Sequence, residues 1–427
     1  MDLTHGGSTL ALEYKGRGAE VSVVDCYRTA EDEVKRKLAS AGVEYLEEAP
    51  ERRFDLAVIP IHCPDSFLGK ATYGRKITAH QAVGELCSFE AKIIEVTGTR
   101  GKTSTCHAIA HILKELGASV MLLSSRGIFH IVEKTERIEQ NASIAPPSIL
   151  RIWKMRREFD FGVFEVSLGG TGLAEIGVIT SIEGNYPIAA ATRNAFEGKA
   201  LMASSVTRSL VVREKEKDLW LDHVDEGVGI VTFGEGGAID VKATPPLSFE
   251  KSVMLDIYTD GGYVLSVETV GSYLVPSYLP AFSAAVAVAV EAGAELKDSV
   301  ASLASFTGIP GRGEVSKDGD AWIVRERNPG VTASTIDYTI AILRDYYGFK
   351  KMGVVVEPTT RKVCEKLDIG AFEEVVASRR DCVTGGYLFY RGNDEVRESQ
   401  VLKRIDSVSN ISGRHDAVIW CTKEAFQ

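Results

Sequence analysis

The chain has 427 residues, more than one hydrophobic core usually organises, so two or three domains are expected. Its apolar fraction of 44% supports well-buried sheets, and no apolar run is long enough to cross a bilayer. The net charge of −10 argues against a nucleic-acid partner, because phosphate contacts need clustered lysine and arginine side chains.

The cysteines and the first residues of the chain point to the cytoplasm. The 7 cysteines are scattered and form no C-x-x-C pair, which favours reduced thiols over disulfides or a structural zinc. The N-terminus has neither the basic start nor the apolar core of a signal peptide. We therefore expect a cytoplasmic protein, monomeric or homodimeric, that acts on a small molecule without a membrane partner.

Residues 1–88 are predicted to form a small N-terminal substrate-binding α/β domain. Short apolar strands are expected at 18–25 and 55–60, with a charged helix at 30–41 between them. In such a unit a ligand lies at the carboxyl ends of the strands. The polar loops at those ends contain the candidate ligand contacts His5, Gly6 and His62. The alternative for each histidine is a hydrogen bond within its own loop.

An apolar strand at 93–97 runs into a glycine loop and then into a helix that starts near Lys102. Gly98 and Gly101 allow the backbone to curl with its N–H groups inward, and the helix N-terminus attracts an anion. Strand, loop and helix together predict a nucleotide-phosphate site, although Val96 stands where the usual first glycine of such a loop would be. The predicted nucleotide contacts are Thr97, Gly98, Thr99, Arg100, Gly101, Lys102, Thr103 and Ser104.

Within this loop, Lys102 would reach the β- and γ-phosphates of the nucleotide and the Thr103 hydroxyl would hold Mg²⁺. Glu165 lies at the end of a second strand, where it could bind the same ion directly or through water. The alternative is a strand-end carboxylate in solvent. A degenerate loop, kept only for structure, is the alternative for the whole motif.

Residues 89–307 are predicted to form a central ATP-binding domain. Their repeated strand–helix pattern indicates a mainly parallel sheet covered by helices. Gly/Pro-rich turns and alternating Val/Leu at 236–275 predict a segment of antiparallel strands. Residues 281–292 are predicted to form an alanine-rich buried helix.

Residues 308–427 are predicted to form a third α/β domain, hinged at 308–313. The expected elements are strands at 321–324, 352–357, 381–384 and 417–422, a loop at 325–330 and a helix at 333–347. Arg312 lies in the hinge. A surface arginine is usually just solvated, but one on a hinge that faces a triphosphate could neutralise charge when the domains close.

Four motifs together resemble the Mur ligase family, which includes folylpolyglutamate synthase. They are Thr97–Ser104, Glu165-Val166-Ser167, Gly198-Lys199-Ala200 and Pro310-Gly311-Arg312-x-Glu314, and Asn328-Pro329 fits the family as well. The resemblance implies a central P-loop parallel sheet, a small N-terminal α/β domain and a C-terminal Rossmann-like domain. It also implies ATP and Mg²⁺ as cofactors, and a carboxylate activated as an acyl phosphate.

The same resemblance implies residue roles. The catalytic set would be Lys102, Glu165, Lys199 and Arg312, the metal set Thr103, Glu165 and Lys199, and Asn328 would contact the nucleotide. Lys199 matches a lysine that is often carbamylated to bind a second Mg²⁺. The chain departs from the family pattern at Tyr186, which stands where a histidine for that second ion is usual. Its N-terminal domain also lacks the glycine-rich fingerprint that holds a UDP-sugar.

The N-terminal domain resembles one branch of the family, in which the last carbocyclic ring is closed on a nickel tetrapyrrole. The resemblance lies in the Thr-His-Gly-Gly start, the His-Cys-Pro turn and the stretch 77–83. It implies substrate contacts by His5, Gly6, His62, His80 and Tyr186, with Arg100 near the substrate carboxylates. A propionate side chain would be activated by ATP and attacked by a carbon of the same molecule.

Two other functions stay open from the sequence. One is an amide ligase that joins an amine or amino acid to a carboxylate. The other is a non-catalytic P-loop nucleotide-binding module. For carbon–carbon closure, the candidates for a deprotonating base are Glu183, Tyr186 and His80.

Overall fold

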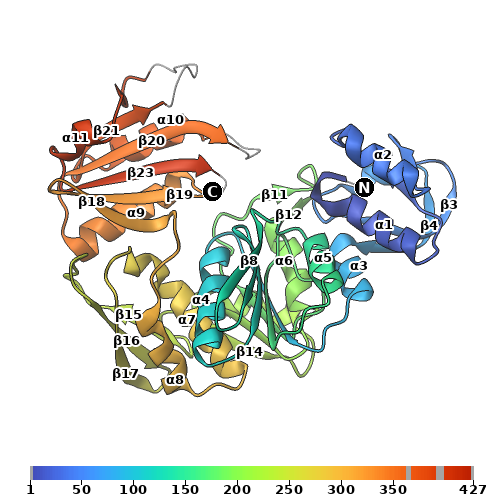
Figure 1. The fold of residues 1–427 in the computed structure, drawn as a ribbon, viewed down its shortest axis with the longest axis horizontal. Coiled ribbons are helices and arrows are strands. Elements are labelled where there is room, and N and C mark those ends of the chain that lie inside the picture. The colour runs from blue at the N-terminus through green and yellow to red at the C-terminus, as the bar shows by residue number, and fades with distance from the viewer. Residues whose placement is uncertain (1–2, 362–366, 391–398, 425–427) are drawn as a thin grey trace. The chain divides into compact units, whose positions relative to one another are not determined.

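The computed structural model describes residues 3–361, 367–390 and 399–424, and the chain forms two compact units. The first unit contains Met1–Ile239 and Ala284–Glu295, and the second contains Asp240–Ser283 and Leu296–Gln427. Each unit combines sheets with helices, so the expected α/β class is confirmed (Figure 1). The domain boundaries at 88 and 307 stay predictions. The six described cysteines are free, and Cys364 lies outside the described residues.

The N-terminal part of the first unit is built from two parallel strand pairs, β1–β2 and β3–β4. Its elements are η1 (Leu3–Gly7), α1 (Ser8–Gly16), β1 (Ser22–Val24), α2 (Asp32–Ser40), β2 (Glu44–Leu46), β3 (Arg53–Ile59), η2 (Asp65–Leu68), β4 (Thr72–Thr78) and α3 (Ala79–Leu86). The expected loop around His5 is a helical turn with a kink at His5 and Gly6. Strands β2 and β4 were not predicted.

A mostly parallel sheet forms the centre of the first unit, as the sequence predicts. Its strands are β5 (Lys92–Thr97), β6 (Val120–Ser124), β7 (Gly127–Ile131), β8 (Thr135–Gln140), β9 (Phe161–Glu165), β10 (Ile176–Ile179), β13 (Ser209–Arg213) and β14 (Gly229–Phe233). Their order is β14-β13-β10-β5-β9-β6-β7-β8, and only the β6–β7 and β7–β8 pairs are antiparallel. Strand β5, which leads into the glycine loop, therefore lies between β10 and β9.

Helices cover both faces of this sheet, which explains why its central parallel strands are largely apolar, whereas the edge strand β8 is polar and mostly exposed. Figure 1 shows α4 (Lys102–Glu115) on one face and α5 (Pro147–Lys154) and α6 (Ala195–Ala203) on the other. Ile93 of β5 and Phe164 of β9 pack in the same core cluster as Ile149 of α5. Each fully buried side chain of this kind stabilises the fold by about 1.5–3 kcal/mol.

The remaining elements of the first unit are short. They are the hairpin strands β11 (Pro187–Ile188) and β12 (Arg193–Asn194), and the turns η3 (Glu214–Leu219) and η4 (Leu221–His223). Helix α7 (Leu279–Glu291) runs from the second unit into the first. It fits the alanine-rich helix predicted at 281–292.

The second unit contains two sheets. The predicted segment of antiparallel strands is confirmed as β15 (Asp240–Ala243), β16 (Val253–Thr259) and β17 (Gly262–Thr269). The larger sheet has the order β18-β19-β23-β20-β21-β22, with strands at Arg312–Asp318, Ala321–Arg327, Ala417–Glu424, Met352–Arg361, Val383–Phe389 and Lys403–Ile405. Its helical elements are η5 (Val275–Tyr278), α8 (Leu296–Ala301), η6 (Ser302–Ser305), α9 (Ala333–Tyr347), α10 (Ile369–Ser378) and α11 (Ser409–Ser412).

Two expectations for the second unit need comment. Helix α9 has the predicted bounds, because Thr332 forms a capping box with Thr335 and Gly348 ends the helix in the left-handed conformation. The loop predicted at 325–330 is wrong in its first half, since Arg325–Arg327 continue strand β19 beside β23. Arg312 likewise begins strand β18 and pairs with Glu326, so it is part of a sheet edge and not of a free loop.

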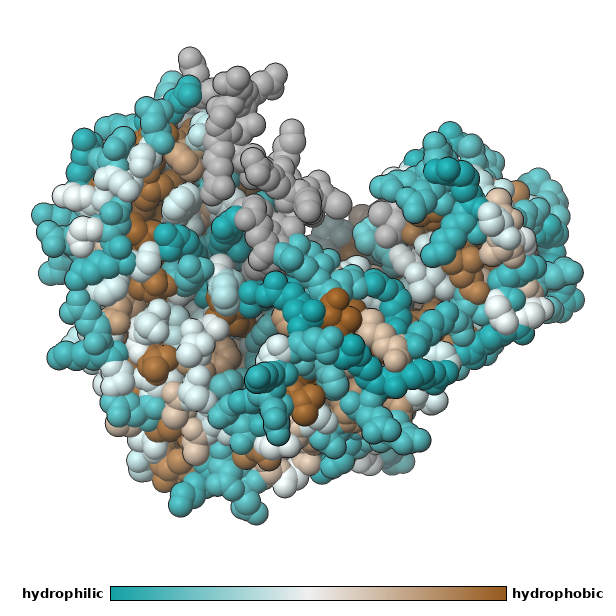
Figure 2. Space-filling model, viewed as in Figure 1, coloured by the Kyte–Doolittle hydropathy of each residue, from teal (hydrophilic) through white to brown (hydrophobic). Residues whose placement is uncertain are grey.

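The visible surface is mainly hydrophilic, and hydrophobic residues appear in small groups (Figure 2). In the part of the chain that the structure describes, no helix is both long and apolar enough to span a membrane.

We predict that Gly84→Ala destabilises the fold, because helix α3 packs directly against the loop that follows β9. A Cβ at Gly84 would overlap the carbonyl oxygen of Thr171. Overpacking of this kind costs about 1–3 kcal/mol in unfolding free energy, which thermal denaturation would show as a lower midpoint. Gly16→Ala at the end of α1 is the matched control, since nothing lies within 4 Å of its Cβ position. Equal midpoints for the two variants would contradict the prediction.

Candidate functional site

The glycine loop after β5 is closed so tightly that only glycine fits its first turn. Gly98 has φ of 142° and Gly101 has φ of 81°, both in the region that side chains disfavour. A Cβ on Gly98 would overlap the hydroxyl oxygen of Thr180. The backbone is therefore held in one curled conformation.

The end of β10 holds this loop in place. Thr99 N–H donates to Ser181 O at 2.8 Å, and Thr180 N–H donates to Thr97 O at 2.9 Å. The Thr180 hydroxyl also donates to the carbonyl of Arg100. These hydrogen bonds engage two carbonyl groups of the loop and the Thr99 N–H, and they hold in place the turn from which α4 starts.

Lys102 is the first residue of α4, and its Nζ donates to Gly98 O at 3.0 Å. A cation folded over the loop, next to a helix N-terminus, forms a positive site for an anion. The Thr97 hydroxyl oxygen is buried below the loop and has no hydrogen-bond partner among the described residues.

Thr103 and Glu165 meet as the sequence predicts. The Thr103 hydroxyl donates to Glu165 Oε2 at 2.9 Å, and the backbone N–H of Ser125 donates to the same oxygen at 3.0 Å. Both side chains are buried, with 3% and 2% exposed. Their proximity follows from the sheet, because Val96 of β5 lies opposite Glu165 of β9.

The donor set around Thr103 fits Mg²⁺. The ion prefers hard oxygen ligands and keeps several waters, so one hydroxyl and one carboxylate are enough when phosphates supply the rest. Among the described residues there is no group of three or more His, Cys, Asp and Glu side chains that could hold a metal.

Lys199 is fully buried on α6, close to the glycine loop. Its Nζ donates to Ala195 O at 3.3 Å and lies 5.7 Å from the centre of the Tyr186 ring. Burial and, to a smaller extent, the positive charge of Lys102 lower the pKa of Lys199 to about 8. A substantial fraction of the amine is therefore neutral slightly above neutral pH.

The base candidates differ in their surroundings. The side chain of Glu183 forms ion pairs with Arg213 at 3.0 Å and with Lys215. The hydrogen bond from Lys215 lowers the pKa of Glu183, which makes this carboxylate a weaker base. Tyr186 is 44% exposed beside Lys199, so its ring is accessible to a ligand.

The three histidines of the N-terminal part lie in one region but differ in exposure. The rings of His5 and His62 meet edge to face, with centres 5.3 Å apart. His80 is buried, and its Nε2 lies 2.7 Å from Ser167 O. Burial lowers the pKa of His80 to about 4, so the ring is neutral and bound to a loop carbonyl. Gly6 approaches Pro147 of α5 so closely that a Cβ would come within 2.6 Å.

The remaining two candidates belong to the second unit. Arg312 lies opposite Glu326, and burial raises the pKa of Glu326 to about 7 while the Arg312 charge opposes this shift. Asn328 is buried at the end of β19, where Nδ2 donates to Gly311 O at 3.3 Å and Oδ1 accepts from Gly330 N–H at 3.1 Å. Asn328 therefore ties the turn after β19 to the glycines before β18.

Several contributors were not singled out from the sequence. Ser125 contacts the metal pair through its backbone N–H, which donates to Glu165, and through its hydroxyl, which lies 3.1 Å from the Thr103 hydroxyl. Thr180 and Ser181 clamp the glycine loop. Thr180 and Ser181 do carry a signal in residue type, since polar residues end a strand next to the P-loop strand.

Comparison with known proteins places this site in a family. Residues 96–285 match the model of the Mur ligase middle domain. The chain is 27% identical over 412 residues to coenzyme F(430) synthetase of Methanosarcina acetivorans, an alignment that covers 87% of this chain and 85% of the relative. It is 26% identical over 435 residues to coenzyme F(430) synthetase of Methanocaldococcus jannaschii, with 95% and 97% covered.

Solved Mur ligases share the fold. MurF ligase from Thermotoga maritima, in complex with ADP, superposes with a TM-score of 0.56 at 15% identity, covering 97% of this chain and 94% of that one. Folylpolyglutamate synthase from Mycobacterium tuberculosis, complexed with ADP and AMPPCP, gives 0.56 at 13% identity, covering 79% and 89%. The chain thus contains a region that matches the Mur ligase middle domain, it has the fold of Mur ligases, and most of its sequence is similar to coenzyme F(430) synthetases.

Proposed function

We propose that the chain is an ATP-dependent ligase that activates a propionate carboxylate of a nickel tetrapyrrole and closes a carbocyclic ring on it. The observation that carries the ligase part is the glycine loop with Lys102 over it and the Thr103–Glu165 pair beside it. Bound ADP in the Thermotoga MurF ligase supports a nucleotide at this loop. Similarity to coenzyme F(430) synthetases over 87% and 95% of the chain supports the tetrapyrrole substrate.

In this proposal each loop residue has a defined task. The curled backbone between Gly98 and Gly101 presents N–H groups to the phosphates, and Lys102 neutralises charge on the transferred phosphoryl group. Arg312 would add a second cation to that group. Thr103 and Glu165 would hold Mg²⁺, which would supply positive charge to offset that of the phosphates.

The first chemical step transfers the γ-phosphoryl group to the propionate oxygen, giving an acyl phosphate and ADP. A carbon of the same macrocycle then loses a proton and attacks the activated carbonyl, and phosphate leaves. The balance is one C–C bond formed, with loss of the elements of water from the tetrapyrrole. An amide ligase would share the first step and differ only in the nitrogen nucleophile.

Lys199 is proposed to hold a second Mg²⁺ after carbamylation. The reaction with CO₂ needs a neutral amine, which the pKa of about 8 supplies. An unmodified ammonium would repel the ion. The described contacts of Lys199 are the Ala195 carbonyl and the Tyr186 ring, and no carboxylate is among them.

We expect Lys102→Ala to abolish ATP turnover with little change in the thermal unfolding midpoint. The side chain contacts the loop carbonyl of Gly98 and not the core, so its removal deletes a phosphate contact without leaving a cavity. Turnover should fall by at least about 100-fold, the size expected for losing one positioned charge. Lys114→Ala, an exposed position on the same helix, is the matched control and should retain wild-type turnover. Wild-type turnover in Lys102→Ala would remove the basis of the proposed function.

Lys199→Met should stabilise the protein most below pH 8 in CO₂-free buffer. The pKa of Lys199 falls from 10.5 in the unfolded chain to about 8, so folding below pH 8 must bury an ammonium. This penalty shrinks as the pH rises from 8 to 10.5, because the amine of the folded protein is then already neutral, and it vanishes above 10.5, where the amine is neutral in both states. The midpoint difference between variant and wild type should shrink over that range, whereas exposed Lys70→Met should show no such trend. A difference independent of pH would show that Lys199 carries no buried charge.

The bond formed is tested by incubating the protein with the open-ring nickel precursor, ATP and Mg²⁺ in the absence of any amine. We expect a product lighter by one water, together with ADP and phosphate, by mass spectrometry. Omission of ATP is the control. Turnover that appears only after ammonia or an amino acid is added would make the protein an amide ligase, and ATP binding without any turnover would favour the non-catalytic module.

A further inference from the structure

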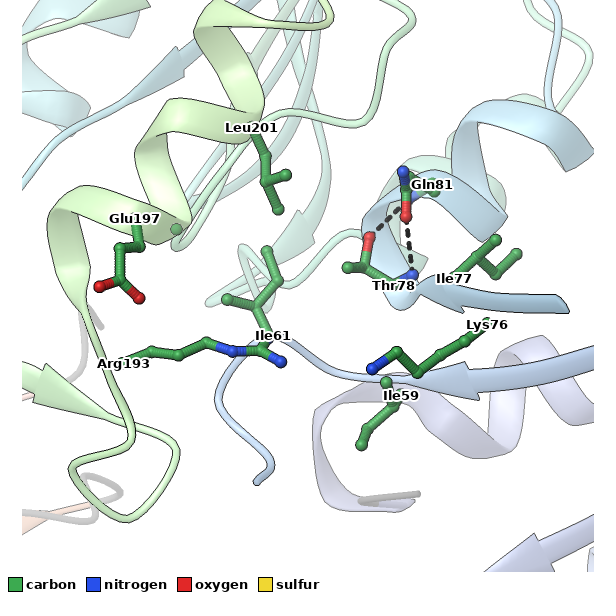
Figure 3. A pocket seen from close by; sticks show the side chains of 10 residues that line it. Ile59, Ile61, Lys76, Ile77, Thr78, Gln81, Arg193, Glu197 and Leu201 are labelled. Atoms are coloured by element: carbon green, nitrogen blue, oxygen red, sulfur yellow. Dashed lines mark hydrogen bonds between the residues drawn. The ribbon is translucent and has the colours of Figure 1, made fainter. Parts of the chain in front are cut away.

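A pocket of about 310 Å³ lies between the N-terminal part of the first unit and helix α6 (Figure 3). Its wall is apolar on the side of Ile59, Ile61 and Leu201, and it is rimmed by polar side chains. The lining residues are Ile59, Ile61, Lys76, Ile77, Thr78, Gln81, Arg193, Glu197, Gly198 and Leu201. A volume of this size is at the lower end of ligand pockets, so it suits one edge of a large ligand.

Two cations define the pocket. Lys76 comes from β4 and Arg193 from β12, and Figure 3 shows their charged ends pointing towards each other across it. Asp65 forms an ion pair with each of these cations. Its Oδ2 lies 2.6 Å from Lys76 Nζ, and its Oδ1 lies 3.2 Å from a guanidinium nitrogen of Arg193. One carboxylate thus bridges two cations that belong to distant parts of the chain.

We propose that this pocket binds a carboxylate-bearing, apolar edge of the substrate macrocycle, with the ligand carboxylate replacing Asp65 between Lys76 and Arg193. The inference rests on the proposed function and names the residues that hold the substrate. It assigns the pair Lys76 and Arg193 as anion anchors and Asp65 as their occupant in the free protein.

The replacement of Asp65 by a ligand carboxylate is favoured because Asp65 is more exposed to solvent than Lys76 and Arg193. The Asp65 side chain is 47% exposed, whereas Lys76 and Arg193 are 32% and 31% exposed. Asp65 can therefore turn into water at small cost, because ion pairs at the protein surface contribute little to stability. The hydrogen bond from Lys76 holds the pKa of Asp65 below its usual value, so Asp65 is an anion that competes with an incoming carboxylate.

The apolar wall gives the ligand an advantage over Asp65. A ligand edge placed against Ile59, Ile61 and Leu201 leaves water, and the burial of its apolar surface favours binding. Glu197 also lines the pocket and accepts a hydrogen bond from Asn194 Nδ2 at 3.3 Å. Once Asp65 has moved out, two cations face Glu197 and one ligand carboxylate, so the charges balance.

The pocket is connected to the proposed reaction centre by the β11–β12 hairpin. Tyr186, directly before β11, lies over the Lys199 amine, and Arg193 begins β12 at the other end of the connection. Between the strands, Ala189, Ala190 and Ala191 have φ of 51°, 52° and 64°. Such strained backbone conformations cluster at ligand clamps. A ligand seated on Arg193 would therefore extend along the hairpin towards Lys199.

The test is a titration of the full-length protein, without ATP, with the open-ring nickel precursor, followed by the absorbance of the macrocycle. Lys76→Gln and Arg193→Gln should each raise Kd about 10-fold, as expected for the loss of one charge-assisted contact. Asp65→Asn should lower Kd, about 3-fold or more, because it removes the competing carboxylate. Lys70→Gln, which breaks the exposed pair with Glu51 outside the pocket, should leave Kd unchanged.

Asp65→Asn separates this proposal from a structural role of the cluster. If Asp65 only positions the two cations, the variant weakens binding as Lys76→Gln does, and the proposal is overturned. Unchanged Kd in all three pocket variants, with ring closure by the wild type intact, overturns the inference and leaves the proposed function standing. A wild-type protein that neither binds nor closes the precursor overturns both.

Discussion

The close approach of Gly98 to Thr180 is the constraint on which the rest of the site depends. Strand β5 lies between β10 and β9, so the loop at its carboxyl end is held from one side by Thr180 and faces Glu165 on the other. A side chain at position 98 would push the loop away from β10 and move the start of α4 with it. Thr103, the second residue of α4, would then lose its 2.9 Å contact with Glu165. A single glycine therefore couples the anion site to the metal pair.

Buried ionisable groups extend this coupling to the loops around the sheet. Glu95 of β5 is fully buried, and burial raises its pKa to about 7, while Thr171 donates to it through both its N–H and its hydroxyl. The loop that follows Glu165 is thus tied back to the P-loop strand, and His80 binds the Ser167 carbonyl of the same loop. Polar groups this deep in a protein stabilise one arrangement only when they are fully paired. They position the N-terminal part on the central sheet without adding a catalytic group.

The sequence predicts the elements whose signal is local. The strand–loop–helix at 93–116, the helix at 333–347 and the antiparallel segment at 236–275 were all predicted from periodicity, caps and turn residues, and Thr103 and Glu165 were predicted to meet because parallel strands share an edge. Strand β4 was missed because most of its residues are exposed and polar. The meeting of Lys76, Arg193 and Asp65 could not be predicted, since it joins residues up to 128 positions apart. The first part of the loop at 325–330 was misassigned because a buried strand inside a sheet can carry charged residues when, as for Glu326, a partner lies opposite.

The surroundings of the base candidates bear on how ring closure would proceed. Glu183 is engaged by two cations and is a weakened base, and His80 is a neutral ring buried against a carbonyl. Neither is poised to remove a proton from carbon at neutral pH, where a general base works best with a pKa near the operating pH. In an intramolecular reaction the need for such a base is smaller, because holding the two reacting parts together can replace about 7–11 kcal/mol of the barrier. A protein that works in this way needs groups that hold the substrate at a distance from the reacting atoms. The cations Arg193, on the strained β11–β12 hairpin, and Lys76, on strand β4, meet this requirement better than a strong base would.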